Sequence, residues 1–191
     1  MRAQLRIVSG SLKGRKVLCE VHPGLRPTPD MVREALFSIL GNAVPDRAFF
    51  DVFAGTGVIG LEAISRGASS TTFVERDFRL VESLERNART FGVAKQTTVV
   101  RADVYRWVER WTPPAEPVTL FLSPPFDDLD KRPEDFLAAV ELLRNKIADG
   151  SVLVLQLEES PALEQLPERD KYDERHYGRN VLLFWVKNEP S

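Results

Sequence analysis

The stretch Asp51-Val52-Phe53-Ala54-Gly55-Thr56-Gly57-Val58-Ile59-Gly60 decides the fold, because a glycine-rich turn stands there between an apolar strand and a helical pattern. In the spacing G-x-G-x-x-G, the first glycine permits a tight turn and the second lets the backbone approach a ligand. The third lets the helix pack closely on the strand. No Lys-Ser or Lys-Thr follows Gly60, which excludes a P-loop. Alone, this motif predicts a nucleotide-like cofactor without specifying which.

Strand-like and helical segments alternate on the C-terminal side of this turn. The predicted strands are 49–53, 71–75, 97–101, 118–122 and 151–157, and the predicted helices are 58–66, 78–91, 104–111 and 134–148. This alternation predicts a parallel sheet with helices on both faces. The last two runs, 171–177 and 181–187, are separated by too few residues for a crossover and must pair antiparallel. Seven strands favour the Rossmann-like α/β fold of class I methyltransferases over a six-stranded dinucleotide-binding domain.

The N-terminal part has a different composition. Residues 5–8 and 15–18 predict a short hairpin, and Thr28 and Pro29 resemble the N-cap and first position of a helix that ends at Gly41-Asn42. Residues 1–29 hold six basic side chains and one acid, although the chain as a whole has a net charge of −2. We expect an extension at 1–42 and a main domain at 43–191. The basic arm is either a site for nucleic-acid phosphates or a solvated hairpin face, and charge alone favours neither.

Acidic residues near the strand ends make the cofactor prediction more specific. Asp51 precedes the glycines and can hold a cationic amino group, with Phe53 assigned to the same site. Glu75 ends the next strand, where a carboxylate can accept hydrogen bonds from both hydroxyls of a ribose. Asp103 follows the third strand and suits an adenine amino group. Asp51 and Asp103 also fit as helix-capping acids. Together these positions favour S-adenosylmethionine.

The second motif is Ser123-Pro124-Pro125-Phe126, directly after the apolar run 118–122. An aryl amine is a poor nucleophile, and acceptors placed against its N–H bonds favour attack on a methyl group. The first side chain and the following proline carbonyl can be those acceptors, and the aromatic ring can stack on an extruded base. The alternative is a proline turn that ends a strand. The position after the fourth strand favours methylation of an exocyclic amino group.

Composition argues against a membrane protein, a disulfide-bonded protein and a metalloprotein. The 191 residues fit one soluble domain. The apolar runs are too short to span a membrane, and the N-terminus lacks the apolar core of a signal peptide. One cysteine, Cys19, excludes an internal disulfide, and the two histidines lack metal-ligand spacing, so no metal site is expected. Trp107 and Trp111 share a helix face and are expected in the core. We expect a cytoplasmic protein.

Several segments resemble the RsmD family of small-subunit ribosomal RNA methyltransferases. They are Gly10 to Lys16, Gly24 to Thr28, Val32 to Phe37, Asp51 to Ala68 and Val74 to Asp77. The resemblance implies methylation of a guanine N2 in 16S ribosomal RNA with S-adenosylmethionine. The implied substrate is the small ribosomal subunit or an assembly intermediate. We expect the protein to act on it as a monomer. The resemblance also implies that Thr28 contacts the cofactor region, and RNA contacts are assigned to Lys13, Arg15, Lys16 and Arg26.

One position departs from the family pattern, because Ser123 stands where the family has aspartate. A serine hydroxyl still accepts a hydrogen bond, but a neutral acceptor is weaker than a charged one. Asp127 and Asp128 follow on the next turn and are not expected to compensate. A DNA amino-methyltransferase (adenine N6 or cytosine N4) and a non-catalytic assembly factor that binds the cofactor therefore stay open as alternatives. A nicotinamide dehydrogenase would leave the Ser-Pro-Pro-Phe stretch unexplained.

Overall fold

The computed structural model describes residues 2–20, 27–158 and 160–188. Its strands are β1 (Arg2–Arg6), β2 (Lys16–Glu20), β3 (Ala48–Val52), β4 (Ser70–Glu75), β5 (Thr97–Arg101), β6 (Thr119–Leu122), β7 (Val152–Glu158), β8 (Asp173–Tyr177) and β9 (Asn180–Val186). Its α-helices are α1 (Asp30–Leu40), α2 (Val58–Ser65), α3 (Phe78–Phe91), α4 (Val104–Arg110), α5 (Phe126–Lys131), α6 (Pro133–Lys146) and α7 (Pro161–Glu164). Short 3-10 turns lie at Gly41–Ala43, Ala94–Gln96 and Arg169–Lys171.

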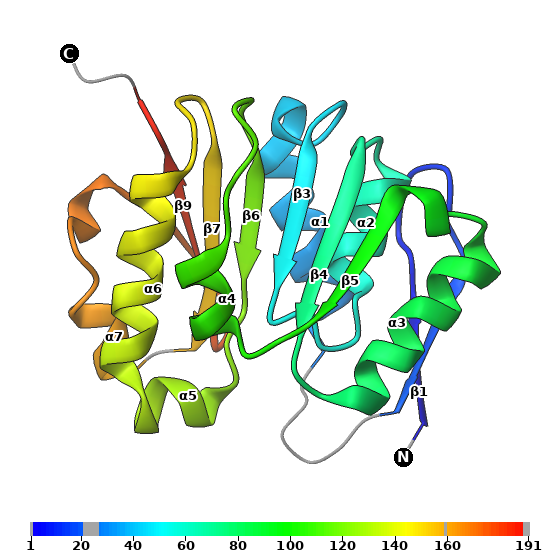
Figure 1. Cartoon of the computed structure of the whole chain (residues 1–191), viewed down its shortest axis with the longest axis horizontal. Coiled ribbons are helices and arrows are strands. Elements are labelled where there is room, and N and C mark those ends of the chain that lie inside the picture. Colours follow the sequence, from blue (N-terminus) through cyan, green and yellow to red (C-terminus); the bar gives the residue numbers. More distant parts are fainter. Residues whose placement is uncertain (1, 21–26, 159, 189–191) are drawn as a thin grey trace.

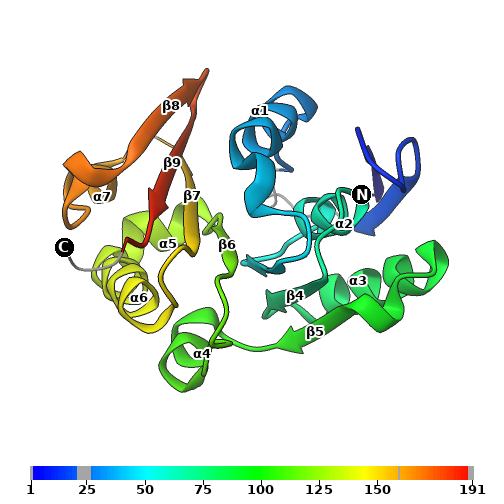
Figure 2. The same ribbon diagram turned by 90° about the horizontal axis from the view of Figure 1, so that it is seen from above.

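Seven strands form the main sheet in the order β5-β4-β3-β6-β7-β9-β8. Figure 1 shows the strands from β5 to β9, and Figure 2 shows β8 beside β9. The strands from β5 to β7 are parallel, and β9 runs antiparallel to both β7 and β8. The predicted parallel sheet with a terminal antiparallel hairpin is therefore confirmed. The loop between β8 and β9 is too short for a crossover helix, which fixes their antiparallel pairing.

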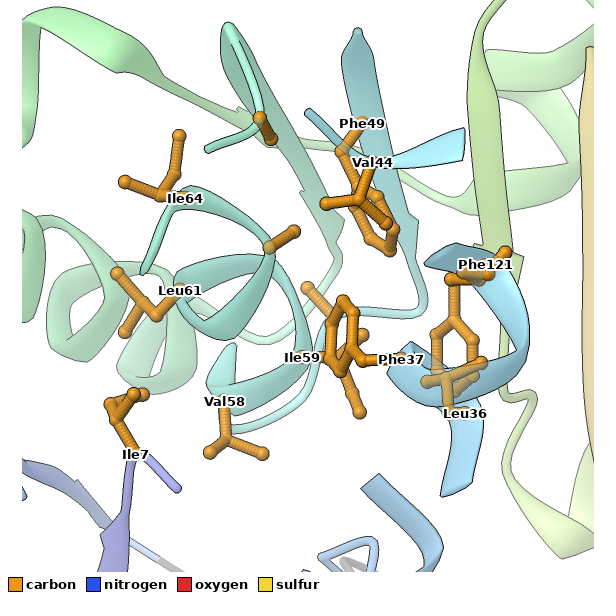
Figure 3. Close-up of a cluster of buried hydrophobic side chains, with 14 of the residues drawn as sticks. Ile7, Leu36, Phe37, Val44, Phe49, Val58, Ile59, Leu61, Ile64 and Phe121 are labelled. Atoms are coloured by element: carbon orange, nitrogen blue, oxygen red, sulfur yellow. The ribbon is translucent and has the colours of Figure 1, made fainter. Parts of the chain in front are cut away.

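Two helical layers cover the sheet (Figure 2). Because successive strand side chains point to opposite faces, Phe49 joins the core under α1, α2 and α3, while Phe50 joins the core under α4 to α7. Figure 3 shows the first of these cores, with Ile59 and Leu61 projecting from α2. On the other face, Trp107 and Trp111 stack with ring centroids 5.0 Å apart; they pack against this core as expected but are only partly buried.

The predicted N-terminal hairpin is present and packs against α2 and α3. Ile7 and Val17 are fully buried in the same core as α2, so this core continues from the extension into the main domain. The side-chain amide of Asn87 on α3 accepts from the Leu18 N–H at 3.2 Å and donates to the Leu18 carbonyl at 2.8 Å. Asn87 thus binds the exposed edge of β2 much as a neighbouring strand would.

Some local predictions were wrong. Thr28 does not cap α1, which begins at Asp30 after Pro29; the Thr28 hydroxyl instead donates to Gln156 on β7 at 2.9 Å. A tertiary partner therefore replaces the local cap. Helices α5 and α7 were missed, because six and four residues are too short to show helical periodicity.

A fully buried arginine, Arg33 on α1, connects β1 to α2. Its Nε donates to Glu62 on α2 at 3.0 Å. Its terminal nitrogens donate to the carbonyls of Thr28 and Arg6 at 2.7 and 2.6 Å, and one lies 3.0 Å from the Asp30 carboxylate. Three chain segments (β1, residues 28–33 and α2) thus meet at one guanidinium group, whose rigid fork suits several acceptors at once.

We expect Arg33→Met to lower the free energy of unfolding by about 3–5 kcal/mol, because it leaves the buried Glu62 charge undercompensated. Among the described side chains, Glu62 would keep only its bond from Arg66, at 2.9 Å. Urea denaturation measures the loss. The double variant Arg33→Met/Glu62→Leu should recover part of it, since that carboxylate is then absent. A loss below about 1 kcal/mol for the single variant would contradict the assigned role.

Candidate active site

A cavity of about 480 Å³ opens at the carboxyl ends of the parallel strands. The chain runs from β3 outward to β5, then returns to β6 and continues to β7 on the other side, so the strand order reverses between β3 and β6. Ligands of open α/β sheets bind at such a reversal. The cavity wall includes these predicted site residues: Thr28, Asp51, Phe53, Gly55, Glu75, Asp103, Ser123, Pro124, Pro125 and Phe126. Both predicted motifs therefore meet in one cavity.

The glycine-rich turn needs its glycines for different reasons. Gly55 has a φ of 51° on the cavity wall, which agrees with the predicted tight turn. A side chain on Gly60 would come within 2.3 Å of Phe73 on β4, so the predicted close helix–strand packing is confirmed. Gly57 differs from its predicted ligand contact: it is absent from the wall, has a φ of 71°, and a Cβ there would lie 2.0 Å from Leu84 on α3. Packing, together with a left-handed backbone, explains that glycine.

Asp51 is almost fully buried at the end of β3. Its Oδ2 accepts from the Gly60 N–H at 2.9 Å, so it does bind the first turn of α2, as the capping interpretation allowed. Burial raises the pKa of Asp51 to about 8; the Gly60 bond opposes that shift, and the nearby charge of Glu75 adds to it. A cation in the cavity would relieve the cost of ionising this carboxyl group, which makes Asp51 well suited to an amino group.

Glu75 is held firmly by backbone amides. Its Oε2 accepts from Gly55 N–H at 2.8 Å, and its Oε1 accepts from the N–H groups of Arg76 and Asp77 at 2.8 and 2.9 Å. A carboxylate offers about four lone-pair positions, so in this arrangement one remains, on Oε2. The structure therefore leaves room for one conventional hydroxyl bond, where the sequence predicted two.

Asp103 caps α4 as the sequence predicted, since its Oδ1 accepts from the Arg106 N–H at 3.3 Å. Its Oδ2 lies 3.5 Å from the Arg132 guanidinium, which follows α5. Although Asp103 also lines the cavity, both oxygens already have protein partners. Its predicted contact to an adenine amino group stays a proposal.

The Ser-Pro-Pro-Phe motif lies on the other side of β3 from Glu75. Ser123 directly follows β6, and its N–H points to the Val52 carbonyl of β3 at 3.4 Å. The carbonyl of Pro125 accepts from the Asp128 N–H at 2.9 Å and so begins α5. Phe126 is 54% exposed although it lines the cavity. An aromatic ring left partly uncovered at a cavity wall is available for stacking.

The sequence missed a buried pair in the same wall. Asp128, which was expected on the next turn and not to compensate for Ser123, is buried in this wall and accepts from the Tyr105 hydroxyl at 2.9 Å. Burial, followed by the charge of Asp128, raises the pKa of Tyr105 far above its ordinary value, so the hydroxyl stays a donor. Phe53, with a φ of 63°, meets the Tyr105 ring edge-on at 5.7 Å. Asp127 instead faces solvent and pairs with Lys131. No local pattern links residue 105 to residue 128.

Three basic residues of the N-terminal arm lie outside the cavity wall. Lys13, Arg15 and Lys16 are exposed, as a phosphate-binding role requires. Arg15 also has a structural contact, because its guanidinium donates to the Thr90 carbonyl at 2.6 Å and lies over the Phe91 ring. Arg26, the fourth predicted RNA contact, lies outside the described residues.

Two other features concern the described residues as a whole. Within residues 2–20, 27–158 and 160–188, no group of His, Cys, Asp or Glu side chains is arranged to hold a metal ion. In the same ranges, no helix has the length and hydropathy needed to cross a membrane.

Comparisons with known proteins agree with this geometry. The family described as Conserved hypothetical protein 95 matches residues 5–186. The ribosomal RNA small subunit methyltransferase D of Escherichia coli K12 is 39% identical over 123 residues, covering 64% of this chain and 61% of that protein. The chain spans 55% to 61% of the length of the first curated relatives that it matches.

Solved structures extend the likeness across the chain. A hypothetical protein of Thermus thermophilus is 31% identical, with a TM-score of 0.73, and covers 95% of this chain and 99% of its own. The RNA methyltransferase of Salinibacter ruber, solved in complex with S-adenosyl-L-homocysteine, is 19% identical with a TM-score of 0.62, covering 87% of this chain and 96% of its own. That likeness concerns the fold, which is that of class I S-adenosylmethionine-dependent methyltransferases. With a family match over nearly its whole length, the chain belongs to the Conserved hypothetical protein 95 family, the RsmD family that its sequence motifs resemble.

Proposed function

We propose that this protein transfers a methyl group from S-adenosylmethionine to the exocyclic N2 amino group of a guanine in 16S ribosomal RNA. The observation that carries the proposal is one cavity lined by Asp51 and Glu75 on one side of β6 and by Ser123 to Phe126 at its end. The first side suits an amino group and a ribose; the second suits an aryl amine. Family membership supports the RNA substrate.

The residues present fit the cofactor. Asp51 would hold its cationic amino group, because its buried carboxyl lacks a compensating cation among its described contacts. Glu75 would accept from a ribose hydroxyl through Oε2, and Asp103 would lie near the adenine amino group. When bound, S-adenosylmethionine supplies an electrophilic methyl group.

The other side of the cavity positions the amine. Phe126 would stack on the extruded base, and Ser123 Oγ and the Pro124 carbonyl would accept from its N–H groups. Such acceptors disfavour delocalisation of the nitrogen lone pair into the ring and direct it toward the methyl group. Proline fixes φ and therefore helps to aim these carbonyls. We assign phosphate contacts to the exposed Lys13 and Lys16, to Arg15 and to Arg26.

We further propose that the protein acts as a cytoplasmic monomer on the small ribosomal subunit or an assembly intermediate. The decisive experiment incubates the protein with labelled S-adenosylmethionine and unmodified small subunits, followed by nucleoside analysis. N2-methylguanosine at one position is expected. Label that enters duplex DNA but not ribosomal RNA would instead establish the DNA amino-methyltransferase alternative.

A second candidate function follows from Ser123, which replaces the aspartate of the family pattern. A protein that binds the cofactor and ribosomal RNA without turnover would be a non-catalytic assembly factor. Cofactor binding without methylated product, on both subunits and assembly intermediates, would favour this candidate.

We expect Ser123→Asp to raise kcat by about 5- to 10-fold. A charged acceptor forms a hydrogen bond that is stronger by about 1 kcal/mol than that of a neutral one. This gain arises in the transition state, because the amine nitrogen becomes positively charged there. Single-turnover methylation measures it. Ser123→Asn is the control, since it changes the size similarly without adding charge. Equal rates for Ser123→Asp and the unaltered protein would contradict the assigned acceptor role.

Cofactor affinity is expected to rise with pH between 6 and 7.5. The pKa of Asp51 is raised to about 8, so the carboxyl is largely protonated in this range and must ionise to pair with a cation. The affinity gain approaches tenfold per pH unit well below that pKa. The upper limit of this pH range stays below the pKa of an α-amino group, about 7.7–8.0, so that the amino group of the cofactor stays protonated. Isothermal titration calorimetry measures the dissociation constant.

The raised pKa of Asp51 also determines how the stability of the folded protein changes with pH. A carboxyl with a raised pKa binds more protons in the folded state, so its contribution to stability falls as pH rises from about 4 to about 8.

Two controls test the assignment of Asp51 to the amino group of the cofactor. Asp51→Asn should remove the pH dependence of cofactor affinity. Methylthioadenosine, which lacks the amino group, should bind the unaltered protein independently of pH. A flat profile for S-adenosylmethionine would contradict this assignment.

A further inference from the structure

Three polar side chains form a connected group in the wall of the cavity, and two of them, Gln156 and Asn180, have no part in the cofactor assignment. Gln156 on β7 is 7% exposed; its Oε1 accepts from the Thr28 hydroxyl at 2.9 Å, and its Nε2 donates to Asn180 Oδ1 at 3.0 Å. All three line the cavity and come from segments far apart in the chain. Thr28 and Asn180 thereby orient the Gln156 amide.

Sheet register places this group beside the proposed amine acceptor. Leu122 at the end of β6 pairs with Leu155 of β7, so Gln156 stands at the same level as Ser123 on the neighbouring strand. Adjacent strands lie about 4.8 Å apart. Asp51 and Glu75, two of the residues assigned to the cofactor, lie on the other side of β6. Gln156 therefore faces the part of the cavity where the base would lie.

The Gln156 amide has hydrogen-bonding capacity to spare. A primary amide offers two N–H donors and two acceptor lone pairs, and Thr28 and Asn180 use one of each. Within the part of the chain that the structure describes, one N–H and one lone pair of this amide remain. A side-chain amide reads a base through such a donor–acceptor pair.

We propose that Gln156, oriented by Thr28 and Asn180, selects guanine among the amino-bearing bases. On guanine the amino group is followed along the same edge by N1–H and O6, which match the free lone pair of Oε1 and the free N–H of Nε2. On adenine and cytosine the ring nitrogen next to the amino group is an acceptor and would face Oε1. This assignment rests on the proposed function, because it takes the N2 amino group to lie at Ser123.

Base analogues test the proposal without depending on overall rate. RNA fragments are prepared with guanine, 2-aminopurine or 2,6-diaminopurine at the target position. Both analogues keep the 2-amino group, but their N1 is an acceptor and they lack O6. The unaltered protein should prefer guanine by about 5- to 150-fold in kcat/KM. Gln156→Met should reduce this ratio to near one, whatever its absolute rate.

Two further variants separate base reading from a structural role. Gln156→Glu keeps the shape but presents two acceptors, so it should shift preference from guanine toward 2,6-diaminopurine, whose 6-amino group donates. Asn87→Leu, which removes a buried amide outside the cavity wall, should change rates without changing the ratio. An unchanged ratio in Gln156→Met would overturn the proposal.

Equilibrium binding of the same RNA fragments, with S-adenosyl-L-homocysteine present, gives a measurement independent of chemistry. Preferential binding of the guanine fragment that is lost in Gln156→Met supports base reading even if no product forms, and only the proposed function then fails. Equal binding of all three fragments, together with equal kcat/KM wherever product forms, overturns base reading and leaves methylation standing.

Discussion

Replacing Glu75 with alanine is expected to weaken S-adenosylmethionine binding at least 100-fold. The variant loses a charge-assisted hydrogen bond to the ribose, worth about 1.5–3 kcal/mol. It also releases the amides of Gly55, Arg76 and Asp77, which now bind the carboxylate and shape the glycine-rich turn. Calorimetric titration measures the affinity, and thermal unfolding checks that the variant is folded.

Glu85→Ala is the matched control, since Glu85 is an exposed glutamate on α3 outside the cavity wall. If Glu75→Ala does not fold, Glu75→Gln serves instead. Its amide keeps one acceptor for these backbone N–H groups but places an NH₂ group against the others. Unchanged affinity in a folded Glu75 variant would remove this residue from the cofactor site.

Phe126→Ala is expected to lower kcat/KM for RNA methylation by about 5- to 150-fold, while the dissociation constant of the cofactor stays unchanged. Stacking of a base on an aromatic side chain contributes about 1–3 kcal/mol. Because the Phe126 side chain is 54% exposed, its removal should cost little stability. Phe126→Tyr should keep most of the activity, since it retains the stacking ring.

Phe78→Ala provides the control for this prediction. Phe78 is 53% exposed, begins α3 and is absent from the cavity wall, so its removal changes exposed aromatic surface without changing the site. Methylation is measured at subsaturating RNA with cofactor in excess. Equal losses in the Phe78 and Phe126 variants would attribute the effect to the surface rather than to stacking.

Ser123 and Asp128 bear differently on the missing family aspartate. Ser123 stands where the resemblance to the RsmD family implies an acid, and it can offer only a neutral acceptor. Asp128 supplies a buried carboxylate in the same cavity, yet its Oδ2 accepts from Tyr105 and its Oδ1 lies 3.8 Å from Arg76. These partners hold Asp128 in place, so Ser123→Asp remains the informative substitution.

The sequence alone determined the elements whose signals are local. Strand periodicity, the short connection before Val181 and the G-x-G-x-x-G spacing predicted the parallel sheet, its antiparallel end and the cofactor turn. The sequence also placed Asp51, Glu75 and Ser123 near strand ends, and because the carboxyl ends of parallel strands share one edge, all three line one cavity.

Tertiary structure decided what depends on contacts between distant segments. Thr28 has the local signature of a helix cap, yet its hydroxyl donates a hydrogen bond to Gln156, 128 residues later in the chain. Arg33 has the pattern of a surface residue on an amphipathic helix, but Glu62 and the Arg6 carbonyl make its burial favourable. Such partners are set by the packing of helices on the sheet. Periodicity reports which face of an element is buried, but not which polar group that face will contact.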